Sequence, residues 1–478
     1  MSQLGRTTVV YFSTQIGSTL VGFIATWYIT QALGAGAFGR YSTAVAFLFW
    51  LTIPSSAIGQ ATKKRISEGV DQSSFLTAGH IINLFIYLVL CGGLLFFREQ
   101  VNIFIGLEVA VPFAFLVGVR ALFDLTLDSL RGYKKVGTSG GVKTLEKTLR
   151  SGIHIGVLSF FSAGVAGLVL GHGIALVLAV GVGLFLLHKP PSRLEWRHVQ
   201  SLIAYAKYAW LGALKTRAFA WTDIVVMRGL SLSVIGLATV SQEQIGIYKI
   251  AWTVASALAL LSLSINASLF PEISELEKNN DYDRVHHYLN EGLTFTGLFL
   301  VPGFFGAIAV GDTLLTVFGQ EFAAGGSILV ILMSSRLLAA YGDLLLSTIN
   351  AIDRPDISFR VNLGYISVNV MLNLLLVSTL GWYGAAIATA LAAFSSVGFA
   401  SYALTTIIGK PDIPVAEIAR QIGASTVMLG AVLILQILLP ETFRWTIVVI
   451  GVGALIYSVV LSIISRRIRD KMLSVASI

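Results

Sequence analysis

The chain has 478 residues, of which 55% are hydrophobic and only 12% are charged. Because soluble domains carry about 25% charged residues, this composition excludes a soluble enzyme or binding module and indicates an integral membrane protein. The net charge of +8 does not indicate nucleic-acid binding, since polytopic membrane proteins gain such an excess from basic loops retained in the cytoplasm. The single cysteine, Cys91, excludes a disulfide framework and a cysteine-based metal site.

Apolar runs long enough to cross a bilayer recur about fourteen times along the chain. The longest polar stretches between them lie near 61–75, 131–147, 188–203 and 271–288, and no soluble domain interrupts the series. We therefore predict an all-α polytopic membrane protein with about 14 transmembrane helices. The expected spans are 8–32, 41–60, 76–97, 109–130, 148–166, 168–187, 206–231, 244–269, 289–310, 325–349, 359–379, 382–407, 419–439 and 445–465.

Basic residues are distributed unevenly between the two sides of these spans. If the N-terminus is cytoplasmic, 24 of the 33 Lys and Arg residues fall in cytoplasmic segments, and three, Arg40, Arg98 and Arg444, fall in outer loops. Positive residues are retained on the cytoplasmic side during membrane insertion. We therefore predict a multi-pass protein of the cell membrane with an even number of spans and with both termini in the cytoplasm.

Two sets of short matches indicate an internal repeat. GRYSTA at 39–44 matches GIYKIA at 246–251, and RISE at 65–68 matches EISE at 272–275, both at one offset (246 − 39 = 207). Farther along, Gly164 and Gly167 match Gly381 and Gly384. Their order predicts two parallel six-helix lobes related by an axis along the membrane normal. We expect the lobes at 1–187 and 206–407, a cytoplasmic linker at 188–205, and two extra helices within 408–478.

The repeat makes a specific structural prediction. Gly39 and Gly246 should occupy equivalent points in the two lobes, each just before a span. Two similar lobes that face each other enclose a cavity, and rocking one lobe against the other exposes that cavity to alternate sides of the membrane.

The span near 206–231 carries Lys215, Arg217, Asp223 and Arg228, although charge inside a bilayer is costly and normally faces protein or water. Arg217 and Arg228 are 11 positions apart (228 − 217), which brings them within about 20° of one helix face and about 16 Å apart along the axis. The excess of positive charge favours an anionic ligand, and the planar fork of Arg suits phosphate. Alternatively, the basic side chains reach the two membrane interfaces by snorkelling.

Two other spans contain charges of both signs. Arg120, Asp124 and Asp128 share one face of the fourth span, and Arg336 and Asp343 lie about two turns apart on the tenth. We predict that Arg120 pairs with Asp124 or Asp128 and that Arg336 pairs with Asp343, which would fix helix packing. If the two arginines instead point into a cavity without carboxylate neighbours, they belong to a ligand site.

The residues also resemble a known family. LGAGAFGRYSTA at 33–44 resembles the LGxxxFGxY signature of the polysaccharide flippases, which belong to the multidrug/oligosaccharidyl-lipid/polysaccharide exporter superfamily. TDIVVMRGL at 222–230 and LFPEISEL at 269–276 are similar to the second-lobe pattern of that family, and the resemblance extends over the whole chain.

The resemblance implies a transporter that moves a polyprenol-linked oligosaccharide, held through phosphate or pyrophosphate, from the cytoplasmic to the outer leaflet. It implies that Lys215, Arg217, Arg228 and Lys249 bind phosphate, that Arg40 lies at an outer gate, and that Asp223 couples to an ion or holds an arginine. It implies no cofactor beyond a coupling ion, either Na⁺ or H⁺. The expected partners are the lipid-linked oligosaccharide, the bilayer, and glycosyltransferases or a polymerase of the same pathway for envelope polysaccharide or glycoprotein glycans.

Three alternatives remain open at this point. A membrane-embedded glycan polymerase, ligase or glycosyltransferase would place catalysis in a large outer loop or an acidic metal site, and the sequence offers neither. A cation-coupled drug exporter of the same superfamily would need net negative residues in its cavity, whereas 206–231 is net positive. A non-transporting scaffold is the third. We therefore expect no enzymatic activity, no metal site and no nucleic-acid partner.

Overall fold

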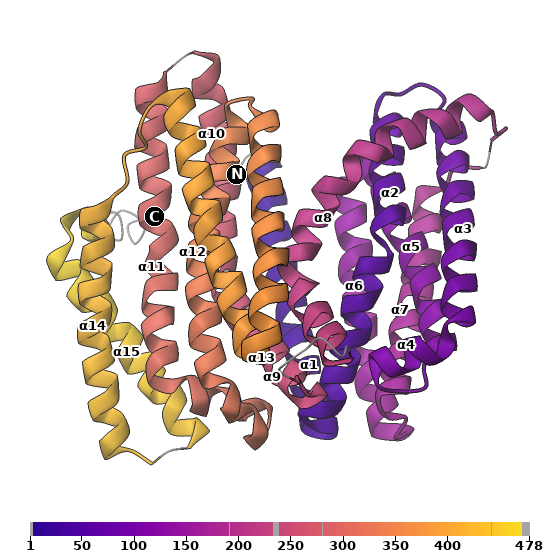
Figure 1. Cartoon of the computed structure of the whole chain (residues 1–478). Helices are drawn as coiled ribbons and strands as arrows, with labels where there is room; N and C mark the ends of the chain where they lie inside the picture. The colour runs from indigo at the N-terminus through magenta and orange to yellow at the C-terminus, as the bar shows by residue number, and fades with distance from the viewer. Residues whose placement is uncertain (1–2, 191, 233–238, 280, 441, 471–478) are drawn as a thin grey trace. The chain divides into compact units, whose positions relative to one another are not determined.

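A computed structural model describes residues 3–190, 192–232, 239–279, 281–440 and 442–470, and these residues contain helices but no strand (Figure 1). Two short 3-10 helices, Thr316–Phe318 and Gln320–Gly325, precede α12. The α-helices are α1 (Gln3–Leu51), α2 (Ile53–Ser67), α3 (Gln72–Phe96), α4 (Arg98–Ile105), α5 (Ala110–Gly132), α6 (Val136–Phe160), α7 (Gly164–Leu187), α8 (Trp196–Leu232), α9 (Gln242–Leu258), α10 (Leu260–Lys278), α11 (Tyr282–Leu315), α12 (Gly326–Ala351), α13 (Pro355–Ile408), α14 (Val415–Leu438) and α15 (Phe443–Ile464).

Each of the fourteen predicted spans coincides with a helical segment, although several spans share one long helix. Gly34 in α1 (φ 75°) and Gly381 in α13 (φ 59°) have backbone angles that only glycine adopts readily, so each breaks its helix between two predicted spans. By length and hydropathy, nine helices among the described residues can cross a membrane, or ten if the bent pair α9 and α10 counts as one span. The all-α polytopic fold is therefore confirmed.

The polar stretches that were predicted as connections are shorter than expected. α6 begins at Val136 and α8 at Trp196, so much of 131–147 and of the 188–205 linker is helical. Neither helix is among the nine apolar ones, and both carry charged residues along their length. A polar helix inside a membrane protein must face other helices or water, so the charged side chains of α6 and α8 are expected to face other helices or water.

By its contacts, the chain divides into two compact units. One consists of 1–232 with 241–246, and the other of 233–240 with 247–478. In the first unit, α5 packs against α2, α3 and α7, while α6 packs against α1 and α7. α8 packs against α1, α2 and α3 of this unit, although the sequence repeat assigns it to the second lobe. The contacts between helices do not test the boundaries of the sequence repeat, which stay a prediction.

Three connections of the first unit, all predicted to be cytoplasmic, meet at one end. Arg197 contacts Asp71 at 3.2 Å, which joins the start of α8 to the α2–α3 connection. Lys135, just before α6, donates to the carbonyl of Leu186 near the end of α7 at 2.8 Å. The short helix α4 lies at the opposite end of the unit, because the whole of α3 separates it from Asp71 (Figure 1).

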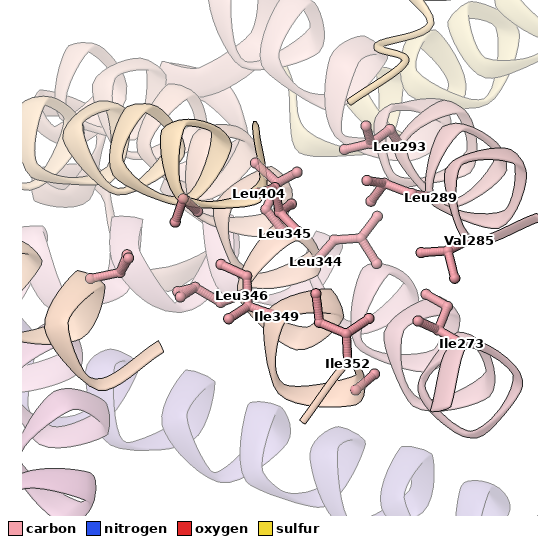
Figure 2. Close-up of a cluster of buried hydrophobic side chains, with 14 of the residues drawn as sticks. Ile273, Val285, Leu289, Leu293, Leu344, Leu345, Leu346, Ile349, Ile352 and Leu404 are labelled. Carbon is pink, nitrogen blue, oxygen red and sulfur yellow. The ribbon is translucent and has the colours of Figure 1, made fainter. Parts of the chain in front are cut away.

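The second unit has a corresponding polar end. Asn290 of α11 donates to the carbonyl of Asp412, before α14, at 2.9 Å and accepts from Arg467, after α15, at 2.7 Å. Figure 2 shows the apolar core next to this end, where Leu289 of α11, Leu344 of α12 and Leu404 of α13 converge. α11, α12 and α13 therefore share the apolar core of this unit.

The second glycine pair of the repeat has matching backbone roles in the two units. Gly164 (φ 54°) starts α7, and Gly381 (φ 59°) starts the second half of α13, so both occupy positive-φ turns between two spans. At Gly167 an added Cβ would lie 2.5 Å from the Val157 side chain, and at Gly384 it would overlap the Leu376 backbone. Each second glycine therefore allows close contact with the preceding helix, as homologous halves predict.

Candidate functional site

The repeat glycines Gly39 and Gly246 contact each other within the first unit. Both lie near the beginning of a helical segment, Gly39 after the break at Gly34 and Gly246 after the start of α9. The prediction placed each glycine just before a span, whereas both are already helical. A Cβ on Gly39 would overlap the carbonyl oxygen of Gln242, and one on Gly246 would overlap that of Ala35. The two overlaps are reciprocal because Ala35 and Gln242 are related by the same offset (242 − 35 = 207).

We call this contact the glycine crossing. Each added Cβ would also lie 3.0 Å from the backbone nitrogen of the other glycine, so the two backbones touch with no side chain between them. Thr43, one turn beyond Gly39, donates to the side-chain oxygen of Gln242 at 3.0 Å and is fully buried. The crossing therefore excludes water and depends on glycine at both positions.

Arg228, a predicted phosphate-binding residue, lies beside the glycine crossing, at the C-terminal end of α4. Arg228 donates to the carbonyls of Ile103 and Phe104 at 2.6 and 2.7 Å, and Gln242 donates to that of Ile105 at 3.2 Å. A guanidinium suits this position because the last carbonyls of a helix lack partners and carry partial negative charge. Arg228 therefore caps α4 in this conformation.

Arg40 lies beside the same point. A Cβ on Gly106, which ends α4 in a left-handed conformation, would lie 3.6 Å from Nη2 of Arg228 and 3.7 Å from Cγ of Arg40. Arg40 is exposed, whereas Arg228 is partly buried. The two arginines together concentrate positive charge beside the glycine crossing.

A second basic group lies on α5 and α8. Arg120 forms a two-pronged ion pair with Asp124, with N–O distances of 2.9 and 3.2 Å, as their spacing predicted. Arg217 of α8 contacts the same carboxylate at 3.6 Å, and it donates to the Phe49 carbonyl at 2.7 Å and to Thr52 Oγ1 at 3.2 Å. Two guanidinium groups therefore share one carboxylate.

The charge of this group, which we call the arginine pair (Arg120 and Arg217 with Asp124), is net positive. The three side chains are only 11–17% exposed. The ring of Phe49 lies under both guanidinium groups, 4.8 Å from that of Arg120 and 5.9 Å from that of Arg217. Asp128 does not neutralise the excess, because it pairs with Arg131 at 3.2 Å. The arginine pair therefore has spare capacity for an anion.

Asp124→Asn is expected to destabilise the protein by about 3 kcal/mol, because it leaves two buried guanidinium groups without a counter-charge. Unfolding followed by circular dichroism in mixed micelles measures the change. Glu68→Gln is the matched control, since the ion pairs of Glu68 with Lys64 and Arg65 are exposed and should contribute less than about 1 kcal/mol. Equal losses in the two variants would contradict a structural role for Asp124.

The remaining predicted residues lie elsewhere. The side chain of Lys215 lies outside the described residues. Asp223 is buried within α8, and Lys249 is half-buried on α9. Arg336 of α12 stacks on the Trp252 ring at 4.7 Å. Its pairing with Asp343 stays a prediction.

Sequence analysis missed a buried polar cluster on α6 and α7. Glu146, Arg150 and His154 follow each other at intervals of four on α6, and they face Tyr41 of α1 and His172 of α7. Glu146 lies in the polar stretch 131–147, whereas Arg150 and His154 lie in the predicted span 148–166, so the predicted boundary divides the cluster. The four-residue spacing is the signal that would have revealed the cluster.

Comparisons with known proteins agree with this picture. Residues 232–453 match the family model described as "Lipid II flippase MurJ". The chain is 29% identical to "Probable flippase AglR" of Haloferax volcanii over 99% of this chain and 98% of the relative. It is 24% identical to "Probable low-salt glycan biosynthesis flippase Agl15" of the same organism, over 85% of this chain and 82% of that protein. The chain is therefore similar to proteins described as flippases, one of them in glycan biosynthesis, as its motifs indicated.

Solved structures agree on the fold. The chain resembles the inward closed conformation of the lipid II flippase MurJ with a TM-score of 0.81 at 16% identity, over 96% of this chain and 99% of that one. It resembles an inward-facing multidrug resistance MATE family transporter with a TM-score of 0.68 at 11% identity, over 81% and 95%. Both sequence relatives are described as flippases, which agrees with the prediction of a membrane transport protein.

Proposed function

We propose that the protein flips an oligosaccharide linked to a polyprenol through phosphate or pyrophosphate, from the cytoplasmic to the outer leaflet, by alternating access. The observation that carries the proposal is the arginine pair, which holds two guanidinium groups against one carboxylate on helices of the membrane domain. Both sequence relatives are described as flippases, and the name of one of them, Agl15, refers to glycan biosynthesis, which supports the same class of substrate. The glycan belongs to an envelope polysaccharide or to glycoprotein assembly.

The charge on the lipid head group is the main barrier to such a movement. An isolated phosphate or pyrophosphate that leaves water meets a large desolvation penalty unless the protein supplies counter-charges and hydrogen bonds. Arg217 and Arg228 lie on one helix, α8, and meet the head group at successive depths in this proposal. Lys215 and Lys249 add positive charge along the path, and Asp223 couples to an ion or holds an arginine.

The glycine crossing supports a role as the outer gate. It lies beside α4, at the end of the first unit opposite the basic connections around Asp71 and Lys135. With both termini in the cytoplasm, as the positive residues predict, this end faces outward. In this proposal Gly39 and Gly246 must separate to release substrate, and Arg40 and Arg228 receive its phosphate there.

Selective binding tests the substrate class. A polyprenyl diphosphate oligosaccharide present at 100 times its Kd should stabilise the purified protein by about 2.7 kcal/mol, and Arg217→Gln should remove most of that gain. A lipophilic cation such as tetraphenylphosphonium should give none, because the arginine pair repels it. Stabilisation by the cation alone would reject the proposal and favour a drug exporter.

A further inference from the structure

Two lysines on α6 lack a counter-charge of their own. Lys143 is exposed and Lys147 is half-buried, and neither forms an ion pair or a hydrogen bond with another residue that the structure describes. They are four positions apart, so their side chains lie on one face of the helix, about 6 Å apart along its axis. Like charges at this spacing repel each other and destabilise a helix. An anion bound between the two lysines would remove that repulsion.

Lys143 lies within electrostatic range of the arginine pair. It interacts with the charges of both Arg120 and Asp124 across the contact between α5 and α6. Because Asp124 is already shared by Arg120 and Arg217, its carboxylate does not neutralise Lys143 as well. The lysine therefore adds to the positive charge of the arginine pair.

Lys147 lies one helical turn farther from the start of α6 and packs against α1. A Cβ on Gly22 would lie 2.7 Å from Cε and 3.3 Å from Nζ of Lys147, and Gly22 belongs to the first predicted span, 8–32. Charge at such a position in a membrane protein is costly, so it normally faces water or a polar partner and marks the path of a substrate or ion. The ammonium group of Lys147 is therefore a candidate ligand for an anion inside the first unit.

Two of the acidic groups that act on the lysines and the arginine pair are already engaged. Glu146 pairs with Arg150 at 2.8 Å, and Asp128 pairs with Arg131 at 3.2 Å. The two lysines and the two guanidinium groups of the arginine pair are therefore balanced by the one carboxylate of that pair, which leaves an excess of three positive charges (four cations less one anion). A diphosphate diester carries two negative charges and a monophosphate diester carries one. The diphosphate thus matches the excess better.

We infer that Lys143 and Lys147 form a second phosphate-binding subsite beside the arginine pair, so that the protein selects a diphosphate-linked oligosaccharide over a monophosphate-linked one. The planar guanidinium groups of Arg120 and Arg217 hold one phosphate, and the two ammonium groups hold the next as point charges that need no fixed orientation. The lysines are thus specificity-determining residues. This inference rests on the proposed function, because it names the head group that the flippase recognises.

Binding of two lipids that carry the same oligosaccharide tests the subsite without transport. The purified full-length protein is titrated with a polyprenyl diphosphate oligosaccharide and with the corresponding polyprenyl monophosphate oligosaccharide. The wild type should bind the diphosphate about 10- to 100-fold more tightly, as expected for charge-assisted hydrogen bonds to one further phosphate. Lys143→Gln/Lys147→Gln should lose this preference and keep its affinity for the monophosphate, which also shows that the variant folds. Lys143→Arg/Lys147→Arg should retain the preference, because the positive charges remain.

Lys64→Gln/Lys134→Gln is the matched control, because it removes two positive charges at exposed positions of the predicted cytoplasmic connections. It should keep the full preference, and a loss of preference there would reduce the effect to net charge and overturn the inference. Equal affinity of the wild type for the two lipids, or a preference that survives in Lys143→Gln/Lys147→Gln, would also overturn it. If that double variant binds neither lipid, the single variants Lys143→Gln and Lys147→Gln decide by the same ratio. A wild type that shows the preference but flips neither lipid would refute the proposed function alone.

Discussion

Gly39→Ala is expected to prevent the glycine crossing from closing. The added Cβ would occupy the position of the Gln242 carbonyl oxygen, and a backbone atom cannot rotate out of the way as a side chain can. Overpacking typically costs 1–3 kcal/mol, and we expect about 3 kcal/mol here, which shifts the balance toward the open state about 100-fold. Gly246→Ala should have the same effect, because the overlap with Ala35 is its reciprocal.

Maleimide labelling of Thr43→Cys in a Cys91→Ala background measures the opening. Thr43 is fully buried against Gln242 when the crossing is closed, so the labelling rate reports the open fraction. Gly36→Ala is the matched control on the same helical segment, since a Cβ there meets nothing within 4 Å. If Gly39→Ala labels no faster than Gly36→Ala, the crossing is not a barrier to water.

Arg217→Gln should reduce transport 10- to 100-fold while the protein still folds. Its guanidinium contacts Asp124 and donates to Phe49 and Thr52, and a hydrogen bond from a charged group contributes about 1.5–3 kcal/mol. Arg217→Lys should retain part of the activity, because Lys keeps the charge but loses the planar fork. Complementation of a flippase-deficient strain, scored by its cell-surface glycan, measures transport.

Membrane expression must be compared in parallel, and Lys207→Gln is the control for a lost positive charge at an exposed position of the same helix. Arg228→Gln should also impair transport, and in addition it should loosen the end of α4, whose carbonyls it caps. Full activity in the double variant Arg217→Gln/Arg228→Gln would contradict phosphate binding by these residues, and it would indicate that both side chains only snorkel to the membrane interfaces.

Much of the fold could be predicted from the sequence because apolar length and basic loops directly reflect the bilayer. The hydrophobic runs predicted segments that are helical in the structure, and the repeat offset of 207 identified Gly39 and Gly246 as equivalent positions. What the repeat could not show is that these two glycines touch. Sequence identity reports equivalent positions, whereas contact between equivalent positions depends on the path of both backbones in space.

The polar helices were harder to predict for a physical reason. Lys143, Glu146, Lys147 and Arg150 lower the hydropathy of α6, so the sequence placed Lys143, Lys147 and Arg150 at a cytoplasmic connection. In the structure, Glu146 and Arg150 neutralise each other within the helix at 2.8 Å. A paired charge costs far less to bury than an isolated one, and pairing is visible only when the residues are considered at helical spacing.

One ion pair of the candidate site was predicted from the sequence, but its contacts between helices were not. Arg120 and Asp124 pair as their four-residue spacing requires, since residues four apart lie on one helix face. The sequence could not show that Arg217, almost one hundred residues later, joins the same carboxylate, or that Arg228 caps α4. Both contacts join helices far apart in the chain, so no local spacing encodes them.

Flipping of a lipid-linked oligosaccharide by the purified protein is the direct test of the proposed function. Vesicles with a fluorescent polyprenyl diphosphate oligosaccharide in both leaflets are treated with a membrane-impermeant quencher. We predict that the wild type exposes the inner-leaflet lipid to the quencher, and that protein-free vesicles and the Arg217→Gln/Arg228→Gln variant protect it. Equal protection of the inner-leaflet lipid in wild-type and protein-free vesicles would contradict the proposed function.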